Sequence, residues 1–374
     1  MRFSTTCGSG WVLGGPSQKS KVQTMKSFLS FALCIAFSAS GCSQSGSQRL
    51  DVENQSAEGT AQKAEGTTKT AALQNQIKEI AAEAKGKVGV TAVALESGEI
   101  VVSLNPQEHF PMQSVYKLPI SMAVMQAVDA GKIKLTDKVS VSKSDMVGRA
   151  AHSPIRDRHP NGTSLTVEEL LRYALADSDG TASDVLMKLA GGPAAVQAYL
   201  TGLSIKDLIV LDTEQTFTQD KTAQYRNWAT PEAAVALLRA LHERRGLSES
   251  SQSLLLKFMT ESKPGQKRLK GLLPAGTLVA HKTGTSGTDK GVTAATNDIG
   301  IITLPNGKRV AIAVFVSDSP ADEATREGVI AKIASAVYGA VSGEQKRLTR
   351  GAGTRRRGEK ADGWLSPRGV AENE

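Results

Sequence analysis

The sequence has no cysteine between residues 72 and 340. Its three cysteines, Cys7, Cys34 and Cys42, all lie in the N-terminal part of the chain. A disulfide scaffold, a cysteine-based zinc site and a catalytic thiol are therefore excluded for residues 72–340. Long apolar runs are also missing: the stretch 27–41 is too short for a confident transmembrane helix, which excludes a polytopic membrane protein.

Basic charge is scarce where a nucleic-acid-binding domain would need it. The formal net charge is +8, of which residues 1–71 and residues 341–374 contribute +3 each, which leaves +2 for residues 72–340. A nucleic-acid-binding domain concentrates basic residues on its folded face, so we expect no nucleic-acid partner. The content of 40% apolar and 22% charged residues is that of a globular protein and excludes full disorder.

The ends of the chain are typical of targeting and tether segments. A basic residue, a short apolar run at 28–37 and three small residues precede Cys42, as in a secretory signal. The ending resembles a bacterial lipoprotein signal, which implies a lipidated Cys42 and an outer-membrane anchor, with ordinary signal cleavage as the alternative. We therefore predict an upstream segment and signal at 1–42, a flexible tether at 43–71, a folded domain at 72–340 and a basic disordered tail at 341–374.

The pattern of apolar residues in 72–340 predicts an α+β fold. Helical spacing predicts helices at 73–84, 118–130, 167–176, 182–190, 231–245 and 321–338. Runs of β-branched residues predict strands at 88–95, 100–104, 278–283, 298–304 and 309–316, and Asn306-Gly307 marks a hairpin between the last two. Because strands are grouped at both ends of the domain, we expect one antiparallel sheet that both ends complete and that helices cover.

A Ser-x-x-Lys motif, Ser114 to Lys117, opens the apolar helix predicted at 118–130. Side chains three residues apart share one helix face. Burial lowers the pKa of a lysine, which can then take a proton from a neighbouring hydroxyl, and the helix N-terminus supplies N–H groups for an oxyanion. The spacing recurs from Ser140 to Lys143, in a polar stretch that we interpret as surface, and Ser114 alone would more often be a helix cap.

Two further motifs become specific only in combination with the first. Ser-Asp-Gly at 178–180 lies between two predicted helices, where alone it is an ordinary turn. Lys-Thr-Gly-Thr at 282–285 ends a predicted strand, where the glycine lets a ligand approach the backbone and Lys282 can hold an anionic group. Ser-x-x-Lys, Ser-Asp-x and Lys-Thr-Gly in this order are characteristic of class A β-lactamases and penicillin-binding proteins.

From about Ala72 to Tyr338 the sequence resembles class A serine β-lactamases, and among them the extended-spectrum, cephalosporin-hydrolysing (PER-like) branch. The segments that carry this resemblance are Tyr-Arg-Asn-Trp at 225–228, Arg-Leu-Lys-Gly-Leu-Leu-Pro-Ala-Gly at 268–276, His-Lys-Thr-Gly-Thr-Ser-Gly at 281–287 and Thr-Ala-Ala-Thr-Asn-Asp at 293–298. The resemblance implies a five-stranded antiparallel sheet flanked by helices, with an all-helical subdomain. It also implies a monomeric periplasmic enzyme that hydrolyses penicillins and cephalosporins, confers β-lactam resistance and needs no cofactor or metal.

The same resemblance implies roles for single residues. Ser114 would attack the lactam carbonyl, Lys117 would assist removal of its proton, and Ser178 would relay a proton to the lactam nitrogen. Lys282 and Thr283 would hold the substrate carboxylate.

The resemblance completes the site with backbone groups and cleft walls. The backbone N–H groups of Ser114 and Thr285 would form the oxyanion hole. Gly284, Gly180 and His152 belong to the expected substrate-binding set, with His152 where an aromatic residue often walls the site.

Deacylation of an acyl-enzyme needs a base that activates water. The family places a glutamate on a loop between the second and third motifs, and Glu214 matches it. Without the resemblance, Glu214 could not be chosen over Asp212 or Asp220.

The sequence departs from the family pattern at several positions. Gly180 stands where the family usually has Asn, and Thr218 replaces a loop Asn that positions the hydrolytic water. Asp212 and Asn227 occupy the positions of a loop Arg–Asp pair, so we expect that pair to be absent. No basic residue for carboxylate binding is obvious beyond the third motif, where Lys290 is the only suggestion.

Two other functions are compatible with parts of this pattern. A penicillin-binding D-alanyl-D-alanine peptidase would share the nucleophile, but Glu214 and the match along the whole domain oppose it. A non-catalytic envelope lipoprotein of the same fold would explain Gly180 and Thr218, but a binding module has no need of both lysines and both serines. The sequence therefore favours a serine β-lactamase.

Overall fold

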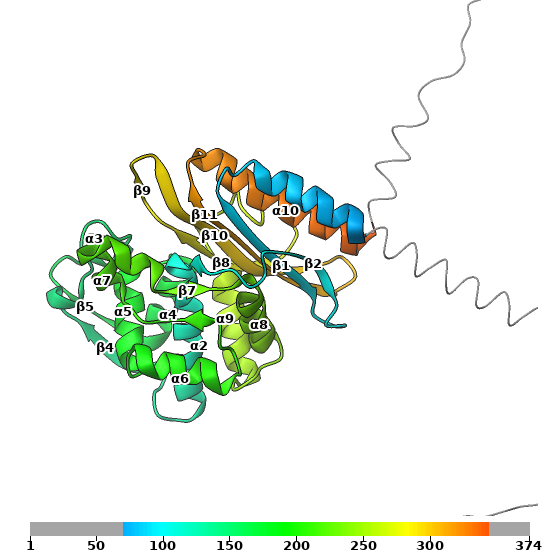
Figure 1. The fold of residues 1–374 in the computed structure, drawn as a ribbon. Helices are drawn as coiled ribbons and strands as arrows, with labels where there is room; N and C mark the ends of the chain where they lie inside the picture. The colour runs from blue at the N-terminus through cyan, green and yellow to red at the C-terminus, as the bar shows by residue number, and fades with distance from the viewer. Residues whose placement is uncertain (1–69, 344–374) are drawn as a thin grey trace, which may run out of the picture. The chain divides into compact units, whose positions relative to one another are not determined.

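The computed structural model describes residues 70–343, and this part of the chain is an α+β fold built on one sheet (Figure 1). The strand order is β2-β1-β11-β10-β8, and β9 pairs with β10. Every pairing in the sheet is antiparallel. The strands are β1 (Lys87–Ala94), β2 (Ile100–Leu104), β8 (Val279–Thr285), β9 (Thr288–Asp289), β10 (Val292–Thr303) and β11 (Arg309–Ser319). The predicted five-stranded antiparallel sheet is thus confirmed, and the two-residue β9 is added to it.

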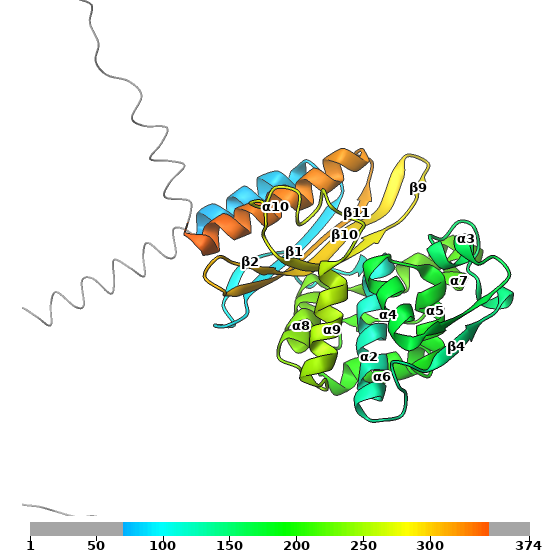
Figure 2. The same ribbon diagram turned by 180° about the vertical axis from the view of Figure 1, so that it is seen from behind.

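Two helices from the two ends of the folded part cover one face of the sheet. The helix at residues 70–82 and α10 (Glu323–Ser342) lie side by side over it in both views (Figures 1 and 2). Their apolar side chains pack on those of the strands in one cluster, in which Ile77, Ile312 and Ile333 are fully buried. Burial of such side chains is the main stabilising contribution to this layer.

The opposite face of the sheet packs on the helical part of the molecule. Helix α8 contacts β1 and β11, and α9 contacts β8. A second and larger apolar cluster fills this layer and continues between the helices. The helices are α2 (Lys117–Asp129), α4 (Val167–Ala176), α5 (Gly180–Leu189), α6 (Pro193–Gly202), α8 (Pro231–His242) and α9 (Glu249–Thr260). This arrangement confirms the expected helical subdomain.

Short elements connect these layers and shape the surface around the cleft described below. The short helices are η1 (Gln113–Tyr116), η2 (Lys143–Asp145), α3 (Pro154–Arg158), α7 (Glu214–Gln219) and η3 (Lys221–Tyr225). The short strands are β3 (Phe110–Pro111), β4 (Lys138–Val141), β5 (Thr163–Thr166), β6 (Leu208–Ile209) and β7 (Trp228–Ala229).

Helix termini follow the local chemistry of the sequence. Thr166 caps α4 through a capping box with Glu169, and Thr230 caps α8 directly before Pro231. Side-chain caps of this kind satisfy backbone N–H groups that have no partner inside the helix. Helices α6 and α9 were not predicted from the sequence, although a proline at the first turn of α6 and the capping Ser248 of α9 are recognisable helix starts.

Some predictions fall outside the described residues. The signal segment at 1–42 with Cys42, the tether up to residue 69 and the tail from residue 344 lie outside residues 70–343. Inside that range the predicted bounds are shifted, because residues 70–71 begin the first helix and residues 341–342 end α10. None of the helices in the described part of the chain is both long and apolar enough to span a membrane.

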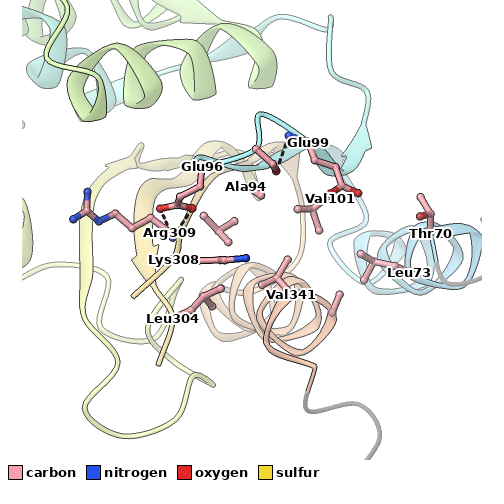
Figure 3. Close-up of a pocket in the computed structure, with 13 residues that line it drawn as sticks. Thr70, Leu73, Ala94, Glu96, Glu99, Val101, Leu304, Lys308, Arg309 and Val341 are labelled. Carbon is pink, nitrogen blue, oxygen red and sulfur yellow. Dashed lines mark hydrogen bonds between the residues drawn. The ribbon is translucent and has the colours of Figure 1, made fainter. Parts of the chain in front are cut away.

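A cavity of about 390 Å³ lies where the two ends of the described part come together (Figure 3). It is bounded by Thr70 and Leu73 of the first helix, by Val341 of α10 and by the turns that follow β1 and β10. None of the three sequence motifs contributes to its lining.

Candidate active site

The motifs meet in one cleft of about 440 Å³. The predicted site residues that line it are Ser114, Lys117, His152, Ser178, Glu214 and Thr285. Residues 150–152 and residues 285–289 also line the cleft. Segments from five regions of the sequence therefore build one site.

Ser114 and Lys117 are in direct contact at the start of α2. Ser114 lies in η1, which runs into α2 at Lys117. The Nζ atom of Lys117 donates a hydrogen bond to Ser114 Oγ at 2.6 Å and forms an ion pair with Glu214 Oε1. Lys117 is only 1% exposed, and a buried ammonium group requires such partners. The expectation that the two side chains share a face is confirmed, and a proton can pass between hydroxyl, amine and carboxylate.

Glu214 is held in place by a carboxylate that the sequence analysis missed. It is the first residue of α7, and its backbone N–H donates to Asp184 Oδ1 at 2.8 Å. The N–H of Gln215 donates to Asp184 Oδ2 at 2.9 Å. Asp184 comes from α5 and is 6% exposed. An aspartate on the otherwise apolar helix α5 could have indicated a buried polar contact. The sequence did not show its partners, because they lie thirty residues away.

Asp184 is expected to make stability depend on pH. Burial raises its pKa from the ordinary 3.8 to about 6, although the two backbone N–H groups act in the opposite direction. Because the folded protein then binds this proton more tightly than the unfolded chain, the contribution of Asp184 to stability falls as the pH rises through about 6. The difference between the two pKa values corresponds to about 3 kcal/mol in the free energy of unfolding.

Denaturant unfolding at pH 4.5 and pH 7.5 checks this expectation. The parent should lose stability between the two pH values relative to Asp184→Asn, which carries no titrating group at this position. An identical pH dependence in parent and variant would contradict it.

Ser178 and Lys282 form the second contact of the site. Lys282 is fully buried, and its Nζ donates to Ser178 Oγ at 2.8 Å and to the carbonyl of Thr283 at 3.1 Å. Burial lowers the pKa of Lys282 well below its usual range, and the nearby charge of Lys117 lowers it further. A lysine of lowered pKa next to a hydroxyl can pass a proton through it.

The segment before α5 is fixed by Asp179. Its carboxylate caps α5 at the N–H of Ala182 and accepts hydrogen bonds from Ser153 Oγ and from the N–H of Ile155. Burial raises the pKa of Asp179, since the carboxylate is removed from water. This network ties the wall of the cleft at His152 to the loop that carries Ser178.

The third motif lies at the end of β8, where Thr285 borders the cleft and is hydrogen-bonded by Arg268. Gly284 admits no side chain, because a Cβ there would lie 2.2 Å from the carbonyl oxygen of Met112. Thr285 is exposed to the cleft, and its Oγ1 accepts a hydrogen bond from Arg268 Nη2 at 2.8 Å. Arg268 is not among the site residues predicted from the sequence. Lys290, which it suggested instead, is exposed and does not line the cleft.

Several predicted binding residues lie behind the lining of the cleft. Lys282, Thr283 and Gly284 are buried in β8, and Gly180 is buried at the start of α5. A Cβ on Gly180 would lie between 3.2 and 3.3 Å from His152 O, from Glu214 Cγ and from a methyl group of Val147, so the space beside this residue is already filled.

Arg226 forms ion pairs with two aspartates of the loop that carries Glu214. Positions 212 and 227 form no Arg–Asp pair, as expected, but Arg226 pairs with Asp212 at 2.7 Å and with Asp220 at 3.0 Å. The neighbouring Asn227 accepts the N–H of Asp212 and donates to its carbonyl. Thr218 donates its hydroxyl to the carbonyl of Gln215, within α7 itself.

Comparisons with known proteins agree with this geometry. A family model described as "Beta-lactamase enzyme family" matches residues 72–341. The extended-spectrum β-lactamase PER-1 of Pseudomonas aeruginosa is 42% identical over 266 residues, which cover 71% of this chain and 86% of that protein. The chain belongs to the class A β-lactamase family. Another relative of this β-lactamase is VEB-1 of Pseudomonas aeruginosa, which is 40% identical over 67% of this chain and 84% of that protein.

Solved structures agree with the family. A β-lactamase from Chitinophaga pinensis has a TM-score of 0.70 at 44% identity and covers 71% of this chain and 98% of that chain. The TLA-1 extended-spectrum β-lactamase has a TM-score of 0.71 at 41% identity, with 73% and 99% covered. The present chain is thus a serine β-lactamase that hydrolyses β-lactams and confers resistance to them, as predicted from the sequence.

Proposed function

We propose that this β-lactamase works through an acyl-enzyme on Ser114. Lys117 passes its ammonium proton to the paired Glu214, and its Nζ, 2.6 Å from Ser114 Oγ, then takes the proton of the hydroxyl. This proton reaches the lactam nitrogen through Ser178, and Glu214 returns its own proton to Lys117. The backbone N–H groups of Ser114 and Thr285, both in the cleft lining, hold the carbonyl oxygen. Glu214 then activates the water that hydrolyses the ester. The single observation that carries this proposal is the hydrogen-bonded chain from Ser114 through Lys117 to Glu214.

The substrate carboxylate binds at the edge formed by Thr285 and Arg268. The hydroxyl of Thr285 faces the cleft, and the guanidinium of Arg268, which is 3% exposed, supports it from behind with Lys282 beside it. Glu327 of α10, 3.1 Å from Nε of Arg268, balances part of this charge. The positive charge that remains attracts an anionic group, because little water screens it. Penicillins and cephalosporins both carry such a carboxylate.

The substrates include cephalosporins, as the resemblance to the extended-spectrum branch implies. The support for this is the similarity to PER-1 and to TLA-1, both described as extended-spectrum, together with a cleft that the strand end 285–289 borders. We further propose that the enzyme is a monomer in the periplasm, held at the outer membrane through a lipid on Cys42. The composition of residues 1–71 supports this location.

A time course with a chromogenic cephalosporin tests the reaction, and mass spectrometry of the acid-quenched enzyme tests the nucleophile. We expect many turnovers per enzyme and a transient mass increase on the peptide that contains Ser114. Turnover without any label on that peptide, or undiminished turnover in Ser114→Ala, would contradict the assignment.

A further inference from the structure

We propose that the buried pair of His281 and Asp298 positions the carboxylate-binding edge of this enzyme. Neither residue lines the cleft. They act through Arg268, whose backbone segment they fix, and are therefore positioning residues. The inference rests on the proposed binding of the substrate carboxylate by Arg268 and Thr285.

The two side chains depend on each other. Both are fully buried, and His281 Nδ1 lies 2.9 Å from each carboxylate oxygen of Asp298. Because carboxylate oxygens of an ionised aspartate only accept, Nδ1 carries the hydrogen of this contact. A buried carboxylate without such donors would be strongly unfavourable, so the position of Asp298 is set by the ring of His281.

Asp298 in turn fixes the backbone at Leu269, next to Arg268. Its Oδ2 atom also accepts the backbone N–H of Leu269 at 3.2 Å, and Leu269 is fully buried. Arg268 is the preceding residue. Its guanidinium donates to the carbonyl of Gly284 (3.2 Å) and to Oγ1 of Thr285 (2.8 Å) at the end of β8, and to the carbonyl of Asn297 (3.0 Å) within β10. Its Nε also pairs with Glu327 of α10 at 3.1 Å.

Two glycines leave the space that this arrangement needs. Gly300 of β10 is the partner of His281 in the sheet, and a Cβ there would lie 2.8 Å from the Cβ of His281. Gly265 has a φ of +78°, and a Cβ there would lie 2.3 Å from Thr283 Cγ2 and 3.5 Å from His281 Cε1. The segment that leads to Arg268 can therefore pack directly on β8 at the histidine ring.

Hydrolysis of a chromogenic cephalosporin and of its carboxylate methyl ester tests the proposal. His281→Leu removes the donor to Asp298, whereas His281→Asn places an amide N–H where Nδ1 lies and should restore the contact. We expect His281→Leu to lower kcat/KM for the free acid about tenfold, mainly through KM, and to change kcat/KM for the ester less than about twofold. His281→Asn should keep the acid-to-ester ratio within about threefold of the parent.

Matched variants separate this effect from a loss of stability. Leu200→Ala in α6, a fully buried residue of the larger apolar cluster to which Leu269 does not belong, destabilises the fold away from this network and should leave the acid-to-ester ratio unchanged. If His281→Leu does not fold, Asp298→Asn replaces it, since Asn keeps the size of the side chain, and the same fall in the ratio is expected.

The positioning role of His281 and Asp298 and the carboxylate-binding edge itself can fail separately. An equal fall for acid and ester, or an unchanged ratio in both folded variants, would overturn the positioning role. A parent enzyme that shows no preference for the acid over the ester would instead overturn the proposed carboxylate edge, and the inference would fall with it. A selective loss for the acid that His281→Asn repairs would support it.

Discussion

The variant Glu214→Gln is expected to accumulate the acyl-enzyme and then to stall. Glutamine keeps the size of the side chain but cannot accept a proton from water, so deacylation should slow by about a thousandfold, within the range for a lost general base. The backbone of residue 214 keeps its hydrogen bond to Asp184, so the loop should remain in place. Stopped-flow traces with a chromogenic cephalosporin should show a burst equal to the enzyme concentration, followed by very slow turnover.

Controls for this variant come from the same loop. Asp212 and Asp220, which sequence reasoning alone left open as candidates for the base, are both engaged by Arg226. Asp220→Asn removes a half-exposed carboxylate of a surface ion pair and should change turnover less than about threefold, because such pairs contribute little. Parent-like turnover in Glu214→Gln, or a stalled acyl-enzyme in Asp220→Asn, would contradict the assignment of Glu214 as the base that activates water.

The elements that the sequence predicted well are those whose signal is local. The strand β2 and the helix α4 have the predicted bounds, because apolar spacing and flanking turn or cap residues mark both ends. By contrast, β10 begins at Val292, six residues before the predicted strand. Thr296 and Asn297 there are polar yet buried. Oγ1 of Thr296 accepts from Arg326, and the amide nitrogen of Asn297 donates to the carbonyls of Pro111 and Met112. Tertiary partners thus override the local polarity.

In the active site, too, contacts between residues close in sequence were predicted and contacts between distant residues were missed. Ser114 and Lys117 lie within one helical turn, so their contact follows from spacing alone. Asp184 and Arg268 were missed because each acts on a segment far along the chain, at residues 214–215 and 284–285 respectively. Glu214 could be selected only by resemblance to the family, since several carboxylates share its loop. Long-range contacts of this kind are set by the fold and leave no periodic trace in the sequence.

The variant Lys117→Met is expected to fail one step earlier than Glu214→Gln. Methionine fills a similar volume in the buried position but accepts no proton, so attack by Ser114 should slow by about a thousandfold. Glu214 also loses the cation with which it pairs, which adds to the defect. The expected observation is therefore the absence of any burst and of any acyl-enzyme mass, together with residual turnover close to background. Accumulated acyl-enzyme in Lys117→Met would show that Lys117 serves deacylation alone.

The chain provides its own control for this prediction. Ser140 and Lys143 repeat the Ser-x-x-Lys spacing, but they lie in β4 and η2, are exposed and do not line the cleft. Lys143→Met should leave turnover within about twofold of the parent, since an exposed substitution away from the site has little effect. The contrast between the two lysines depends on burial and on partners rather than on spacing. Lys117 is enclosed between a hydroxyl and a carboxylate, and only there can a lysine move the proton that makes serine a nucleophile.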